Sequence, residues 1–83
     1  MKFEIIWSYS AIKGLKKLAR IISKRIFEKV SLLSEEPYRY VQKLVGSPFF
    51  KLRIGDYRVI LEIKQHILQI LVIKVGHRSK IYD

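Results

Sequence analysis

The sequence predicts an α+β domain: a helix hairpin packed on one face of a largely antiparallel four-stranded sheet, in the order β-α-α-β-β-β. The order of the segments and the length of the chain support this fold. A long stretch with helical spacing of apolar residues lies between a single strand-like segment and three later strand-like segments. The chain has 83 residues and no internal repeat, so we expect residues 1–83 to form one domain.

The first half is expected to contain one strand and two helices. Residues 2–7 alternate loosely, and Ser8 or Ser10 can cap a following helix. One helix over the whole stretch 10–34 would be about 37 Å long, which is too long for one small core. We therefore expect a break near residues 19–21. Pro37 ends the second helix, because proline disfavours helix in the residue before it.

The second half is expected to form three strands, at about 49–54, 57–64 and 67–75, after a connector with room for a short irregular strand. Gly55-Asp56 suits a two-residue type II′ turn between the first two. This turn would place Arg53 directly opposite Arg58, with Lys51 on the same face.

The net charge of +10 and the pI near 10.1 indicate a polyanionic partner. Nucleic acid is the first candidate and an acidic protein the second. The sequence has no cysteine, which excludes disulfides and thiolate zinc sites, and we expect no metal and no cofactor. There is no long apolar run and no signal peptide, so we expect a cytoplasmic protein that does not bind membranes.

The strand cations suggest a phosphate site. Two arginines directly opposite each other are destabilising unless an anion lies between them, and arginine grips phosphate in a fork. Arg78 follows the last strand and is expected to return to the same rim. The alternative is that these long side chains spread apart in solvent.

A second group of basic residues lies along the helices and at the end of the last strand. We expect it to bind RNA, as the polar face of an amphipathic helix pair together with residues near the C-terminus. Its members are Lys13, Lys16, Lys17, Lys24, Arg25, His77 and Lys80.

The segments "KLRIGDYRVILEI" and "VIKVGHRSKIY", supported by the helical stretch and "KLVG" in the same order, resemble the RelE/ParE toxin superfamily. Within this superfamily, the segments resemble the compact RelE-type mRNA interferases. This resemblance implies a toxin that inhibits translation as a ribosome-dependent endoribonuclease. The 2′-hydroxyl would attack the adjacent phosphate of mRNA, leaving a 2′,3′-cyclic phosphate and a 5′-hydroxyl. The implied partners are mRNA, the rRNA of the ribosome and a RelB-like antitoxin.

The resemblance also implies the catalytic residues, which by position are Lys51, Arg53, Arg58, Arg78 and Tyr82. It leaves the proton-transferring group open among Lys51, Tyr82 and His77. Two other functions fit the same pattern: a non-enzymatic ParE-like toxin that binds DNA gyrase, and a plain RNA-binding module. Neither needs the complete catalytic set.

Overall fold

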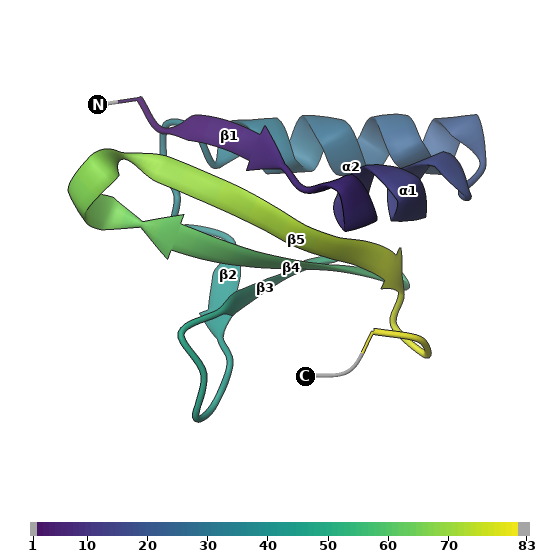
Figure 1. Ribbon diagram of the computed structural model, residues 1–83. Coiled ribbons are helices and arrows are strands. Elements are labelled where there is room, and N and C mark those ends of the chain that lie inside the picture. The colour runs from purple at the N-terminus through teal and green to yellow at the C-terminus, as the bar shows by residue number, and fades with distance from the viewer. Residues whose placement is uncertain (1, 82–83) are drawn as a thin grey trace.

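A computed structural model describes residues 2–81 of the chain (Figure 1). Tyr82, predicted to be catalytic, lies outside these residues. The elements in chain order are β1 (Glu4–Trp7), α1 (Tyr9–Lys16), α2 (Arg20–Leu32), β2 (Val41–Lys43), β3 (Phe50–Ile54), β4 (Tyr57–Lys64), a short 3₁₀ turn η1 (Gln65–Ile67) and β5 (Gln69–His77). The predicted α+β class and element order are confirmed, with β2 in addition.

The sheet has five strands in the order β1-β5-β4-β3-β2, whereas the sequence predicts four. The additional strand, β2, pairs with β3 from Val41 opposite Leu52 to Lys43 opposite Phe50. It is short and carries two polar residues, so its sequence has no apolar pattern typical of a strand. It is a strand because it pairs with β3. β1 runs parallel to β5, and the other neighbouring pairs are antiparallel.

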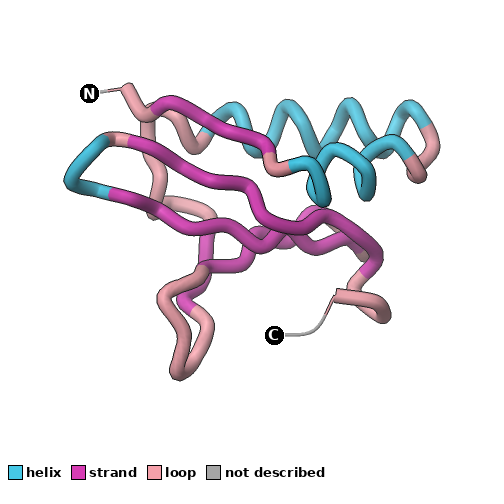
Figure 2. The backbone as a smooth tube through the Cα atoms, in the orientation of Figure 1, coloured by secondary structure: helices cyan, strands magenta, loops and turns pink. Residues whose placement is uncertain are grey.

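The helical stretch is divided as predicted, and both helices lie on the same side of the sheet (Figure 2). α1 ends at Lys16 and α2 begins at Arg20, so the break lies next to its predicted position. The hydroxyl of Ser23 in α2 donates a hydrogen bond of 2.7 Å to the carbonyl of Leu15 in α1. This bond joins the two helices close to the break.

Ser8 is the cap of α1 and also fixes the helix to the sheet. Its hydroxyl oxygen accepts a hydrogen bond of 3.0 Å from the backbone N–H of Ala11. The same hydroxyl donates a hydrogen bond of 2.8 Å to the carbonyl of Ile73 in β5. One side chain therefore sets both where α1 begins and where it lies along β5.

The core lies between the helices and one face of the sheet. Its fully buried large side chains are Ile26, Val30, Leu33, Leu52, Val59, Leu61, Ile70 and Val72. Each contributes about 1.5–3 kcal/mol through burial of apolar surface. Because side chains alternate along a strand, residues between these positions in β3, β4 and β5 lie on the opposite face of the sheet.

Candidate functional site

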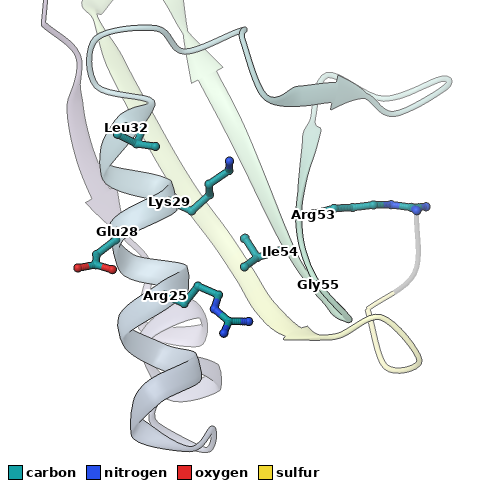
Figure 3. A pocket seen from close by; sticks show the side chains of 7 residues that line it. All are labelled: Arg25, Glu28, Lys29, Leu32, Arg53, Ile54 and Gly55. Atoms are coloured by element: carbon teal, nitrogen blue, oxygen red, sulfur yellow. The ribbon is translucent and has the colours of Figure 1, made fainter.

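The β3–β4 hairpin has the predicted register. Gly55 has a φ of +58° and is the first central residue of the turn, as a type II′ turn requires. Arg53 consequently pairs with Arg58 across the two strands. Figure 3 shows Ile54 pointing toward α2 and Arg53 extending away from it. The two arginines therefore share the sheet face that the helices leave open.

A β-bulge in β5 brings a further cation to this face. Leu61 pairs with Val72, but its neighbour Ile60 pairs with Lys74, so β5 has one extra residue at Ile73. Without this bulge, Lys74 would pair with Val59 and lie on the core side of the sheet. With it, Val75 is buried and Lys74 is exposed.

The resulting basic face consists of Lys51, Arg53, Arg58 and Lys74. Lys51 in β3 and Lys74 in β5 both pair with Ile60 of β4. Ile60 is two residues along β4 from Arg58, so these lysines lie next to the Arg53–Arg58 pair. Lys74 was not among the residues predicted for this site. The detectable signal is the spacing of the buried residues, which changes from two between Ile70 and Val72 to three between Val72 and Val75.

Arg58 and Arg78 are held by different contacts. The Arg58 guanidinium donates through Nη1 to the carbonyl of Ile81 at 3.3 Å, and the side chain is half-buried. The backbone N–H of Arg78 donates to the carbonyl of Asp56 at 2.8 Å, and its Nε lies 4.0 Å from the Asp56 carboxylate. Arg78 is therefore at the hairpin turn, beside the Arg53–Arg58 pair, but its exposed charge is partly balanced by Asp56.

His77 is the last residue of β5, which extends beyond the predicted end of this strand. It pairs with Tyr57, and the two rings meet edge to face with centroids 5.5 Å apart. Its Nδ1 lies 2.8 Å from the hydroxyl of Ser79. Tyr57 alternates with Arg58, so His77 does not share the face of the Arg53–Arg58 pair.

The basic residues of the helices do not form one continuous face. Lys13 and Lys17 line a hollow beside β5, and Lys17 and Lys80 line another with His77. Arg25 lines a separate groove between α2 and the β3–β4 turn, with Arg53 at its rim. The remaining two residues of the predicted group, Lys16 and Lys24, are exposed on the helix surface.

The groove at α2 has a volume of about 470 Å³ and is open to solvent (Figure 3). It lies between α2 and the β3–β4 turn, and its lining combines apolar stems with more positive than negative charge. The lining residues are Arg25, Glu28, Lys29, Leu32, Arg53, Ile54 and Gly55. This groove is larger than the two hollows beside β5 that Lys17 lines.

The described residues hold no cluster of three or more His, Cys, Asp or Glu side chains that could bind a metal ion. None of the helices between residues 2 and 81 is long and apolar enough to cross a lipid bilayer.

A sequence model of the ParE toxin of type II toxin–antitoxin systems, parDE, matches residues 5–82. The chain belongs to this family. The resemblance to the RelE/ParE superfamily noted from the sequence motifs is thereby confirmed. No curated protein matches the sequence significantly.

Solved structures of RelE toxins have the same fold. The toxin–antitoxin complex RelBE2 from Mycobacterium tuberculosis matches with 26% identity and a TM-score of 0.85, over 94% of this chain and 100% of the matched chain. The archaeal RelE–RelB complex from Pyrococcus horikoshii OT3 matches with 26% identity and a TM-score of 0.83, over 98% and 100%. The isolated RelE toxin of E. coli matches with 25% identity and a TM-score of 0.80, over 96% and 90%.

Proposed function

We propose that this toxin is a ribosome-dependent endoribonuclease that cleaves mRNA and is held inactive by a RelB-like antitoxin. The observation that carries the proposal is the Arg53–Arg58 pair on the open face of the sheet, with Lys51 and Lys74 on the next step. Four cations converge there on strands of a rigid sheet. Such preorganised positive charge stabilises the charge that grows on a phosphate during cleavage.

The chemistry requires an attacking 2′-hydroxyl, a stabilised phosphate and a 5′-oxygen leaving group. Arg53 and Arg58 bind the non-bridging oxygens of the scissile phosphate, and Arg78 approaches from the turn. The bond from phosphorus to the 2′-oxygen forms as the bond to the 5′-oxygen breaks, and a proton moves from the first oxygen to the second. Lys51 lies on the basic face and is well placed to exchange protons with the reacting atoms.

His77 is less suited to the proton transfer. Its ring packs against Tyr57 and its Nδ1 lies beside Ser79, on the side of β5 away from the Arg53–Arg58 pair. We therefore assign His77, with Lys80, to RNA binding at the rim. Tyr82 stays a predicted catalytic residue that lies outside the described part of the chain.

The antitoxin is proposed to cover α2 and the adjoining groove. Ile21, Arg25, Glu28 and Leu32 recur at helical spacing along α2, and the two apolar residues are 71% and 52% exposed. An amphipathic helix of an acidic partner could bury these apolar side chains and pair with Arg25. The complexes of RelE with RelB from two organisms support a partner of this kind.

The ribosome is proposed to meet the exposed lysines of the helices. Lys16 and Lys24 are exposed, and no ion pair involves them in residues 2–81. Contacts with rRNA phosphates would release counterions, so toxin affinity for ribosomes should decrease with salt.

The test is primer extension on translated mRNA after induction of the toxin. We expect cuts at codon-spaced positions. The double change Arg58→Ala with Arg78→Ala should abolish both the cuts and the toxicity while the chain remains folded. Arg20→Ala with Arg39→Ala removes the same charge from exposed surface positions and serves as the matched control. A double Arg58/Arg78 variant that still cuts mRNA would refute the assignment of the site.

A second function has one specific observation in its favour, since the matching family description is that of a ParE toxin. A ParE-like toxin that binds DNA gyrase would change plasmid supercoiling and leave mRNA intact. It would not require an arginine pair on the open face. Plasmid topology from the same induced cultures therefore separates the two functions.

A further inference from the structure

A second basic hollow lies between α1 and the end of β5. It has a volume of about 280 Å³, and its charged lining residues are Lys13, Lys17 and Lys74. Ser10 adds a hydroxyl group, and no acidic side chain is part of the lining. Ser10, Lys13 and Lys17 recur at three and four residues, and Lys17 is the C-terminal cap of α1 with helical backbone angles, so the three residues lie on one face of the helix.

This hollow depends on the close approach of α1 to β5. Gly14 lies between the two helix lysines, and a Cβ atom at this position would overlap the carbonyl oxygen of Val75. A glycine in a helix costs about 1 kcal/mol relative to alanine, so helix propensity does not favour it here. Because Gly14 has no side chain, α1 can approach β5 closely and bring Lys13 and Lys17 beside Lys74.

The hollow is continuous with the basic face. The bulge at Ile73 directs Lys74 to the open face, where it borders both Ile60 of the basic face and the hollow. Ile81 also lines the hollow, and its carbonyl accepts the hydrogen bond from Arg58. Bulges of this type often redirect a side chain next to a functional site.

Charge repulsion disfavours this arrangement in the absence of a ligand. Lys13 and Lys17 are like charges at positions i and i+4, which destabilises a helix, and Lys74 adds a third positive charge. An anion placed among them would relieve the repulsion. Lysine binds phosphate well as a point charge, and it does not require the planar geometry of an arginine fork.

We propose that this hollow is a phosphate subsite that holds the RNA backbone beside the scissile phosphate. The inference rests on the proposed function, which places that phosphate between Arg53 and Arg58. An RNA strand is favoured over an acidic peptide because its charges repeat regularly along a chain that can pass from the arginine pair to the hollow.

The test measures binding of 2′-O-methyl oligoribonucleotides to the purified toxin, because these RNAs lack the attacking hydroxyl and are not cleaved. The triple change Lys13→Gln, Lys17→Gln and Lys74→Gln removes the three charges and keeps most of each side chain. The matched control is Lys2→Gln, Arg20→Gln and Lys43→Gln, which removes three charges from exposed positions outside the hollow. Thermal unfolding of both variants checks that they are folded.

We expect the first variant to bind a hexanucleotide about tenfold more weakly than the wild type, and the control to bind it within about twofold. The slope of log affinity against log salt concentration should become shallower by about 0.7, the value expected when one phosphate contact with a single strand is lost. Binding of a dinucleotide, whose single phosphate occupies the arginine pair, should decrease less than binding of the hexanucleotide, because only Lys74 of the three lysines belongs to the basic face.

Three results would overturn the subsite. Equal losses in both triple variants would indicate an effect of total charge alone. A dinucleotide that loses as much affinity as the hexanucleotide would make the hollow the main phosphate site. Normal RNA binding combined with weaker binding of the antitoxin would assign the hollow to the protein partner. A different outcome would be that the wild type makes no cuts in mRNA while the triple variants bind oligonucleotides as expected. This would refute the nuclease function and leave the subsite in place.

Discussion

The change Arg53→Gln should move stability and activity in opposite directions. Arg53 lies directly opposite Arg58, and like charges at such positions destabilise a sheet by about 0.2–1 kcal/mol. Removing one of them should leave the free energy of unfolding unchanged or raise it by up to that amount. The same change removes a preorganised donor from the proposed phosphate site, so mRNA cleavage should decrease by about 10²–10³-fold.

Arg53 is better suited to this test than Arg58. Its side chain is exposed, and no ion pair involves it within residues 2–81. Arg58 is half-buried and donates a hydrogen bond to the Ile81 carbonyl, so its removal also costs about 0.5–1.5 kcal/mol. At Arg58 this loss would offset the relief of repulsion, and the sign of the stability change would carry no information.

The assay combines urea unfolding with cleavage of mRNA on purified translating ribosomes. Arg20→Gln, at an exposed position of α2, is the control and should change neither quantity appreciably. Cleavage by Arg53→Gln as fast as by the wild type would refute the role of Arg53 in binding the phosphate. This role is also refuted if the variant loses more than about 1 kcal/mol of stability and its activity decreases only in proportion to the unfolded fraction.

Two further predictions concern the seating of α1 on β5, and both are measured by urea unfolding. Ser8→Ala should lower the free energy of unfolding by about 1–3 kcal/mol, because it removes the helix cap and leaves the Ile73 carbonyl without its donor. The control Ser10→Ala removes no cap and should lower it by less than about 0.5 kcal/mol. Equal effects of the two changes would refute the role of Ser8. Gly14→Ala should destabilise by about 1–3 kcal/mol through overlap with the Val75 carbonyl, and a stabilised variant would show that α1 can move away from β5.

Much of the fold could be predicted because local chemistry determines it. Gly55-Asp56 sets both the turn and the register, and therefore the Arg53–Arg58 pair, without any information from the rest of the chain. The two helices follow from apolar spacing and from a length that one small core cannot accommodate. Ser8 is a cap because of its position before the first helical turn.

The remainder depends on contacts between distant segments. β2 has too few residues for a pattern and becomes a strand only through its pairing with β3. The bulge at Ile73 is visible only in retrospect, from the three-residue step between Val72 and Val75. His77 lies beyond the predicted end of the last strand at residue 75, but its pairing with Tyr57 keeps it in β5.

The central position of β5 has a consequence for when the toxin can fold. β1 has one strand neighbour, β5, and Glu4 pairs with Gln69, a residue separation of 65. The chain leaves the ribosome N-terminus first, so β1 and α1 must wait for the strand that comes after all the others. Contacts of such long range also slow folding. Lys74 belongs to this same late strand, so the basic face stays incomplete until β5 has been synthesised. The ribosome that synthesises this protein is therefore exposed only to an incomplete sheet until β5 has been made.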